Sequence, residues 1–380
     1  MIGIINNFRI KHLSLLVIIL TFTNCEQADT ENGNTESRDV IQAFDLGEVQ
    51  LLPGMMYDEF QEIKEYYYNI SNDDMLYEYR LSVGETDLPG ERLGGWYKRL
   101  WGLTLNQWIS SYSRIYAITG EERFKEKAEY LFDEWWRCYR KGIAMGISGC
   151  ATNTNNGNND KWTQTILDIY LHCDREDALE KLEVFVDWAQ RSMDTTRLFG
   201  HNSLEWWTIT RPLYLAYTVT GNEKYREYAK FWEYTDWWDM FAYQPIKPFM
   251  QTPVAGNNKE FCHAYSHTNA LNSAAQAYRV TGDKYYFNTI KNYYDWMQNC
   301  QIFATGGYGP ELEHIMPMPR IINALETRTD HFETQCASWS ALLLSQNLIE
   351  LTGDSRYGNW IERLAYNAIN ATIPDRKSVV

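Results

Sequence analysis

The sequence has too few basic residues to cover an acidic partner. Its 35 Lys and Arg stand against 50 Asp and Glu, giving a formal net charge of −15 at pH 7. No block of Lys or Arg lies outside the extreme N-terminus. A protein that binds nucleic acid needs a basic surface to neutralise the phosphates, so the deficit argues against a nucleic-acid partner.

The sequence also lacks a hydrophobic segment that could cross a bilayer at its N-terminus. The apolar run from Leu13 to Phe22 follows Arg9 and Lys11 and is too short for a transmembrane helix. This order is typical of a secretory signal, which we place at residues 1–24. We expect Cys25, which ends a relaxed bacterial lipobox, to be lipidated, and residues 25–40 to form a polar tether. The prediction is an exported bacterial lipoprotein, periplasmic or on the cell surface, that meets the membrane only through its lipid.

Cysteine spacing identifies no disulfide framework. Six cysteines remain after Cys25, and their wide spacings define no pairs. Cys138, Cys173 and Cys300 lie in apolar or helical surroundings, so we expect these three thiols to be inert.

A repeated phrase sets the expected architecture. A Thr-Gly pair recurs at Gly120, Gly221, Gly282 and Gly353, each time between two helix-like segments, the second of which contains Trp. Glycine adopts the left-handed conformation that ends a helix, and an acidic residue near it suits the start of the next helix. Each copy therefore predicts an αα-hairpin, and a degenerate fifth copy runs from Tyr170 to Trp188.

Stacked hairpins predict an all-α fold, an (α/α)6 toroid or barrel whose inner helices point their loops into a central pocket. We expect a short strand at Val49 to Leu52. The polar segment Ala151 to Asp160 cannot be core, and it is either a floppy connection or a loop at the pocket rim. The 15 Trp suit sugar stacking, but core packing is the better interpretation for Trp96 and Trp206 taken alone.

Glu333 and Cys336 are the candidate metal ligands. They lie three residues apart, just before an apolar helical run, so they share one helix face. Carboxylate oxygen and thiolate sulfur both bind zinc, and the pair could be half of a tetrahedral site. Spacing alone favours a simpler interpretation, in which a buried cysteine lies beside a capping glutamate.

Histidines supply a second set of candidates. His263 and His267 are four residues apart and could bind a metal by themselves. We expect His263 to contact a ligand in the pocket and His267 to be a core or supporting residue. His201 begins an inner-helix pattern and is a further pocket candidate.

The sequence resembles the β-L-arabinofuranosidases of glycoside hydrolase family 127 over nearly all of the mature chain. The resemblance rests on the order of several short motifs, which are Asp73-Asp74-Met75-Leu76, Gly94-Gly95-Trp96, Phe199 to Glu205, His263-Ala264-Tyr265-Ser266, Thr305 to Gly309, Glu333 to Ser338 and Trp360 to Arg363. It implies an (α/α)6 barrel and a zinc-assisted retaining mechanism with a cysteine nucleophile. The implied partner is a plant cell-wall carbohydrate, from which β-L-arabinofuranose or a similar sugar is removed.

The resemblance also implies roles for individual residues. These are zinc ligation by Glu333 and Cys336, acid/base catalysis by Glu311 with Glu313 as a competitor, and sugar contact by His201 and His263 with Glu205 in support. Zinc keeps a thiol in its thiolate form near neutral pH. A glutamic acid protonates the departing oxygen and later activates water. A glutamate after a Gly-rich turn could equally cap a helix, so the residues alone leave Glu311 open.

Three departures from the family pattern are visible. The family's Glu-Thr-Cys is one residue longer here, from Glu333 to Cys336, and a His-Lys pair of the family appears as Asp160-Lys161. A downstream Cys-Cys pair, which supplies the nucleophile, and the family's C-terminal β-sandwich domains do not occur in this sequence. Residues 375–380 look like a translated sequencing adapter. We therefore expect the natural chain to continue after Pro374, residues 41–374 to be an incomplete catalytic domain, and the polypeptide as given to be inactive.

Two other functions remain open at this point. The first is a non-catalytic carbohydrate-binding toroid. The second is a polysaccharide lyase or an unsaturated-uronyl hydrolase on the same fold, which would use His, Tyr or Asp without zinc.

Overall fold

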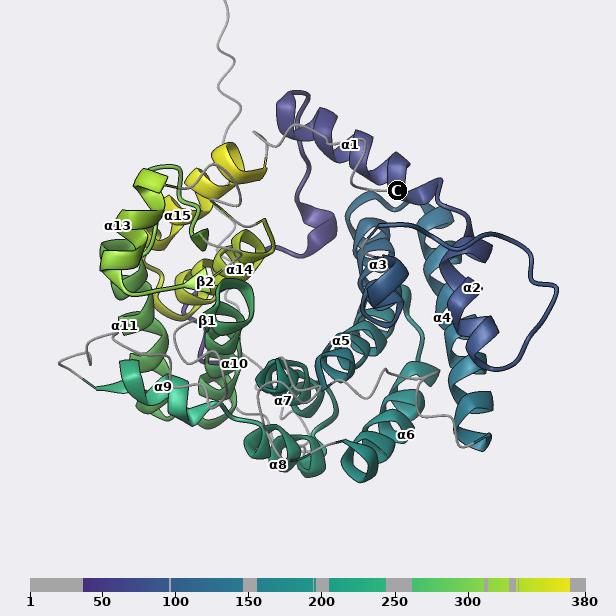
Figure 1. The fold of residues 1–380 in the computed structure, drawn as a ribbon. Coiled ribbons are helices and arrows are strands. Elements are labelled where there is room, and N and C mark those ends of the chain that lie inside the picture. The colour runs from purple at the N-terminus through teal and green to yellow at the C-terminus, as the bar shows by residue number, and fades with distance from the viewer. Residues whose placement is uncertain are drawn as a thin grey trace, which may run out of the picture. The chain divides into compact units, whose positions relative to one another are not determined.

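The computed structural model describes residues 37–95, 97–145, 156–193, 195, 205–243, 262–310, 314–327, 333 and 335–369. Five helices of these residues form the inner layer of a ring, and each contacts the next in chain order (Figure 1). They are α3 (Tyr97–Thr119), α5 (Asn156–Cys173), α7 (Thr210–Thr220), α10 (Ala264–Thr281) and α14 (Gln335–Thr352). The predicted all-α toroid is confirmed.

An outer layer of helices packs against the inner ring (Figure 1). The outer partners of the five inner helices are, in order, α4 (Glu122–Ala144), α6 (Asp177–Ser192), α8 (Glu223–Phe231), α11 (Lys284–Cys300) and α15 (Gly358–Arg363). The remaining helices are α1 (Met55–Tyr68), α2 (Asn72–Ser82), α9 (Thr235–Ala242), α13 (Met318–Thr327), the short 3-10 turns η1 (Leu46–Glu48), η3 (Trp206–Ile209) and η4 (Ser355–Tyr357), and the π-helical η5 (Leu364–Ile369).

The repeated glycines end the inner helices as predicted. Gly120, Gly221, Gly282 and Gly353 have φ between 68° and 72°, the left-handed conformation that glycine adopts without a steric penalty. In the degenerate copy, Asp174 takes this position with φ 57°, which a short polar side chain tolerates. All five inner helices are therefore reversed by the same local device.

Large aromatic side chains fill the space between the two layers. Trp135 of α4 and Trp162 of α5 are fully buried and stacked, with ring centroids 3.6 Å apart and an interplanar angle of 8°. Trp206 is only 7% exposed, so its predicted place in the core is confirmed. The aromatic content is thus explained largely by packing.

Two local predictions were wrong. Val49 has extended dihedrals, but residues 49–52 have no partner strand among the described residues and Leu52 is 79% exposed. The sheet instead consists of β1 (Cys262–His263) and β2 (His314–Ile315), paired antiparallel with His263 opposite His314. The second wrong prediction concerns the segment Ala151 to Asp160, whose described residues begin helix α5 at Asn156. Asp160 is buried, which its carboxylate tolerates because it pairs with Lys161 at 2.9 Å.

The segment that precedes η1 is attached to the ends of two inner helices. Arg38 donates a hydrogen bond to the Arg279 carbonyl at 2.6 Å, and the Val40 amide donates to the Glu350 carbonyl at 2.7 Å. Arg279 in turn pairs with Asp39 and Glu350 at 2.8 and 2.6 Å. These contacts fix the chain across the C-terminal ends of α10 and α14.

The described cysteines are not joined by disulfides. Burial raises the pKa of Cys138 to about 11 and that of Cys173 to about 12, so both thiols stay protonated at neutral pH, in line with their predicted inertness. None of the helices in the described part of the chain is long and apolar enough to cross a membrane.

Glu233 gives the fold a predictable pH dependence. Its buried carboxylate accepts hydrogen bonds from Tyr214 at 2.6 Å and Tyr286 at 2.8 Å, and burial raises its pKa. A raised native pKa means that stability is greatest below the unfolded-state value and falls as the pH rises through the native value. Glutamine does not titrate, so we expect Glu233→Gln to remove the fall in stability at higher pH. The variant should melt at or above the wild-type temperature at pH 7, with an effect of about 1 kcal/mol on the free energy of unfolding.

Thermal unfolding between pH 4 and pH 8 tests this expectation. Glu227→Gln, an exposed position on the preceding helix α8, is the control and should follow the wild-type curve within about 0.5 kcal/mol. A lower melting temperature of the Glu233 variant at pH 7 would show that the ionised carboxylate stabilises the fold.

Candidate active site

His263 lies at the N-terminus of α10, at one end of the ring. It is the N-cap residue, and its Nδ1 accepts a hydrogen bond from the Ser266 amide at 3.3 Å. In the neutral ring this contact assigns the proton to Nε2, which makes that atom a hydrogen-bond donor. The β1–β2 pairing brings His314 beside His263.

Glu205 lies next to His263, as the sequence predicted for one wall of the pocket. Its Oε1 is 3.7 Å from His263 Nδ1. Trp207, two residues further on in η3, donates to the Ser266 carbonyl at 2.8 Å and so holds this turn against α10. Glu205 also has a φ of 125°, a strained conformation for a residue with a side chain, and such strain is concentrated at functional sites.

Lys161 links a second inner helix to this wall. Its Nζ lies 2.9 Å from Asp160 Oδ2 and donates to the Tyr265 hydroxyl at 2.9 Å. Burial alone would lower the pKa of Lys161, but the charges of Asp160, Tyr265 and Glu205 raise it well above its usual value. Asp160, which precedes the lysine here, therefore helps to keep Lys161 charged, and Tyr265 fixes its position.

Trp339 of α14 supplies an aromatic surface to the same site. Its ring centroid is 5.9 Å from that of Tyr265, and the side chain is 45% exposed. An exposed indole on an inner helix is suited to stacking on the apolar face of a sugar. Trp339 is not among the site residues predicted from the sequence. Its position three residues after Cys336 places it on the same face of the helix.

The Gly-rich turn at Thr305 to Gly309 holds Glu333. Thr305 Oγ1 donates a hydrogen bond to Glu333 Oε1, and a Cβ on Gly307 would overlap the Glu333 carboxyl group. The turn itself is closed by hydrogen bonds from the Gly306 amide to the Phe303 carbonyl and from the Phe303 amide to the Gly307 carbonyl, both 2.9 Å. Glycine at residue 307 is thus required for this carboxylate to lie where it does.

Cys336 lies near Tyr308, the residue that follows Gly307 in the same turn. It is the second residue of α14 and is exposed, and a helix N-terminus favours the thiolate form of a cysteine. The Tyr308 hydroxyl lies within hydrogen-bond distance, 3.0 Å, of the Ala337 carbonyl oxygen, so Tyr308 packs against the first turn of α14 next to Cys336. Glu333 and Cys336 therefore lie beside two neighbouring residues of one turn, Gly307 and Tyr308.

Glu333 and Cys336 carry donor atoms that zinc binds, but the two residues do not form a complete zinc site by themselves. Among the described residues, no group of three His, Cys, Asp or Glu side chains is arranged to hold a metal ion. Glu333 and Cys336 account for two of the four ligands that a structural zinc takes. The carboxylate and the thiol are both groups that fit zinc.

Other predicted site residues lie outside this geometry. His201, Glu311, Glu313 and Cys25 fall outside the described residues. His267 is fully buried against Trp207, with ring centroids 4.8 Å apart, and burial lowers its pKa to about 3. It is therefore a neutral core residue, in agreement with the prediction.

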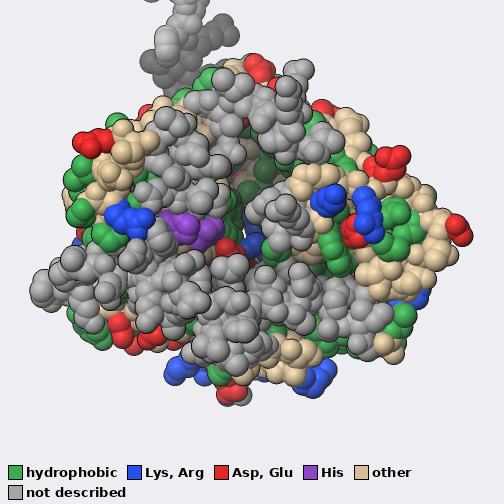
Figure 2. Space-filling model, viewed as in Figure 1, with side chains coloured by type: hydrophobic (Ala, Val, Ile, Leu, Met, Phe, Trp, Pro, Cys, Tyr) green, Lys and Arg blue, Asp and Glu red, His purple; other side chains and the backbone are tan. Residues whose placement is uncertain are grey.

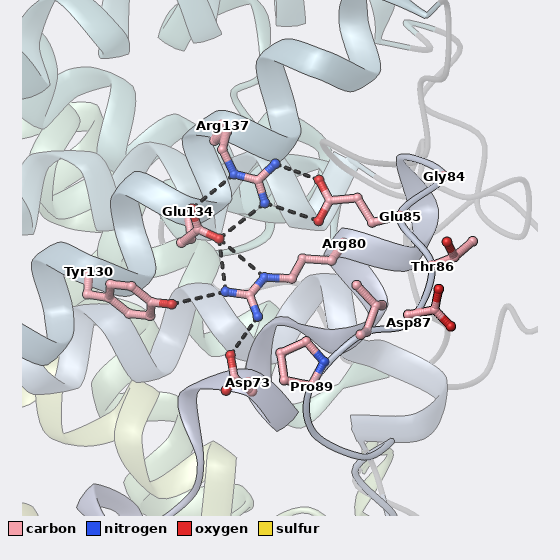
Figure 3. Close-up of a pocket in the computed structure, with 11 residues that line it drawn as sticks. Asp73, Arg80, Gly84, Glu85, Thr86, Asp87, Pro89, Tyr130, Glu134 and Arg137 are labelled. Atoms are coloured by element: carbon pink, nitrogen blue, oxygen red, sulfur yellow. Dashed lines mark hydrogen bonds and ion pairs between the residues drawn. The ribbon is translucent and has the colours of Figure 1, made fainter.

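A separate pocket of about 720 Å³ lies between the outer helices α2 and α4 (Figure 3). Arg80 donates to Glu134 at 2.9 Å and to Asp73 at 2.6 Å, and Arg137 donates to Glu85 at 2.6 Å. Each guanidinium there is neutralised by carboxylates of the protein, so the pocket presents no unpaired arginine to a ligand.

The fold and the grouping of carboxylate, thiol and histidine at one end of its ring define an α/α toroid of the type that glycoside hydrolases use. Residues 48–380 match the β-L-arabinofuranosidase GH127 catalytic domain. The chain belongs to this family.

Solved structures share the fold at low sequence identity. A GH127 β-arabinofuranosidase is 16% identical with a TM-score of 0.59, covering 86% of this chain and 54% of its own. A GH127 β-L-arabinofuranosidase from Geobacillus stearothermophilus T6 is 15% identical with a TM-score of 0.55, covering 82% and 52%. A third, described only as a glycoside hydrolase, is 15% identical with a TM-score of 0.51, covering 78% and 49%. The chain thus spans about half the length of these proteins, and no curated protein sequence matches it.

Proposed function

We propose that this chain carries the active site of a glycoside hydrolase that releases a β-L-arabinofuranosyl or similar sugar from plant glycans with retention of configuration. The observation that supports this most is the position of Glu333 and Cys336 beside neighbouring residues of one Gly-rich turn. A structural pair of cap and core residues would not need an exposed thiol. Family membership supplies the reaction class.

The polar residues of the site hold the sugar. His263 Nε2–H donates to a hydroxyl group, because Nε2 carries the proton in the assigned tautomer, and the carboxyl oxygens of Glu205 accept from another hydroxyl group. Trp339 stacks on the apolar face of the ring. Lys161 and Tyr265, fixed to each other at 2.9 Å, orient the wall that these groups form.

Glu311 follows the turn that holds Glu333, and it donates the proton to the departing glycosidic oxygen while a cysteine thiolate bonds to the anomeric carbon. In the second half of the reaction Glu311 takes a proton from the water that attacks this carbon, and the thiolate leaves. Zinc, when bound through Glu333 and Cys336, keeps thiols of the site in the thiolate form near neutral pH. The helix N-terminus at Cys336 favours the same ionisation.

Metal analysis of the purified full chain tests the zinc site. We expect about one zinc per chain and at least a 10-fold loss of zinc affinity in Cys336→Ser, because a hydroxyl is a poor substitute for a thiolate. Cys300→Ser, which changes a partly buried thiol on α11, is the matched control and should bind zinc as the wild type does.

Hydrolysis of a β-L-arabinofuranoside tests the reaction. In a protein that includes the cysteine nucleophile, Glu311→Gln should abolish release of arabinose, since the amide cannot supply the proton. Equal zinc binding by wild type and Cys336→Ser would contradict the site. A product with the ultraviolet-absorbing double bond of β-elimination would identify a lyase instead, and sugar binding without turnover would favour a carbohydrate-binding toroid.

We further propose that the protein is exported and held at a membrane by a lipid on Cys25. The residues that support this, Arg9, Lys11 and the apolar run before Cys25, come from the sequence alone. Metabolic labelling with a radioactive fatty acid would detect the lipid, and Cys25→Ser should remove the label.

A further inference from the structure

Arg211, the second residue of α7, points into the middle of the ring. Its Nη1 donates to the Gln164 side chain of α5 at 3.0 Å. Charges at four other positions act on it, those of Arg114 on α3, Asp168 and Asp160 on α5, and Arg279 on α10. Only a side chain inside the ring lies near all of these helices at once, and Figure 2 shows a central hollow with acidic and basic side chains within it.

Three other cations on the described inner helices are each paired with a carboxylate of the protein. These pairs are Lys161 with Asp160 at 2.9 Å, Arg114 with Asp168 at 3.0 Å, and Arg279 with Asp39 and Glu350 at 2.8 and 2.6 Å. Arg211 differs, because across the described residues no carboxylate lies within ion-pair distance of its guanidinium. Its single partner, Gln164, is a neutral amide.

A charge in this position has a cost that a ligand can offset. Burial, with the nearby charge of Arg114, lowers the pKa of Arg211 to about 10, so the guanidinium is still charged at neutral pH. It carries five N–H donors in a planar fork, of which Gln164 takes one. The ligand group that matches such a fork in both charge and geometry is a carboxylate, bound through two parallel hydrogen bonds.

The depth of Arg211 indicates which part of a ligand would reach it. On α5, Gln164 is one helical turn past Lys161, and Lys161 belongs to the wall formed with Tyr265 and Glu205. A sugar held by that wall and by Trp339 would therefore place a group at its inner end near Arg211. In an enzyme that releases one sugar from the end of a glycan, the terminal sugar is the one that lies at this inner end.

We propose that Arg211 is a specificity-determining residue that binds the carboxylate of an acidic terminal sugar, so that the ring takes a uronate-type glycan in preference to its neutral counterpart. The inference rests on the proposed function and deepens it. The reaction and the site are unchanged, and the sugar class is specified.

Calorimetric titration of the full chain with galacturonate and with galactose tests the proposal. These probes have the same ring and differ at C6, where one has a carboxylate and the other a hydroxymethyl group. We expect galacturonate to bind at least 10-fold more tightly than galactose, and Arg211→Met to abolish this preference while leaving galactose affinity unchanged. Arg211→Lys keeps the charge without the fork and should retain part of the preference.

The matched control is Arg114→Met, which removes another arginine of the ring. Because Arg114 already pairs with Asp168 at 3.0 and 3.1 Å, its loss should lower the melting temperature and leave the galacturonate preference intact. Arg211→Met should melt at or above the wild-type temperature, since it removes a partly buried charge whose partner is a neutral amide.

The outcomes separate this inference from the proposed function. Binding of both sugars with equal affinity, or an equal loss of both in Arg211→Met, overturns the role of Arg211 and leaves the glycosidase proposal standing. Binding of neither sugar overturns both. A lower melting temperature of Arg211→Met with unchanged preference would show that Arg211 serves the fold instead.

Discussion

Trp135→Ala is expected to lower the free energy of unfolding by about 4 kcal/mol, the typical cost of truncating a fully buried tryptophan. Trp135 stacks on Trp162 with centroids 3.6 Å apart and also contacts Phe185 and Tyr139. Alanine would leave a cavity between α4 and α5 that rigid neighbouring helices cannot close. For a chain of this length the loss corresponds to about 6 °C in melting temperature.

Trp135→Phe is the matched control, because it keeps an aromatic ring in the same space. The indole N–H of Trp135 has no hydrogen-bond acceptor among the described residues, so phenylalanine removes a desolvated donor without breaking a hydrogen bond. We expect a loss of about 1 kcal/mol for this variant. Similar melting temperatures for the alanine and phenylalanine variants would contradict the stacking argument.

The hairpin architecture could be predicted from the sequence because its signal is local. Gly120 and Gly282 end helices through a backbone conformation that belongs to glycine itself. Even the degenerate copy was found, since Asp174 lies where glycine stands elsewhere. The error at Val49 has the opposite cause. A strand needs a partner, and extended dihedrals at one residue do not supply it.

The candidate site was predictable only where its chemistry lies in one short segment. Glu333 and Cys336 are three residues apart, and a thiol beside a carboxylate is a recognisable pair. Lys161 and Tyr265 touch across 104 residues, and nothing in the sequence relates them. The same holds for Arg211, whose significance is the lack of a carboxylate partner among the described residues around it. Such a property exists only after the inner helices have been brought together.

Gly307→Ala is expected to displace the Glu333 carboxylate and to lower zinc affinity by about 10- to 100-fold, the range found when groups that orient a metal ligand are changed. The methyl group would occupy the position of the Glu333 carboxyl, and the hydrogen bond from Thr305 to that carboxylate would be lost. The backbone at residue 307 does not require glycine, because its φ is not positive, unlike the φ of 97° at Gly306. The atoms displaced are the end of a flexible side chain, so the melting temperature should change little.

Gly358→Ala is the control for the glycine change itself. A Cβ at this first residue of α15 meets no atom within 4 Å, and alanine there should leave zinc binding unchanged and stabilise the fold by about 0.5 kcal/mol. Zinc titration and thermal unfolding of both variants distinguish a site effect from a fold effect. If Gly307→Ala bound zinc as tightly as the wild type, Glu333 would have to reach the metal from another position. The turn would then be a structural support for α14, and the glycine would be required for packing alone.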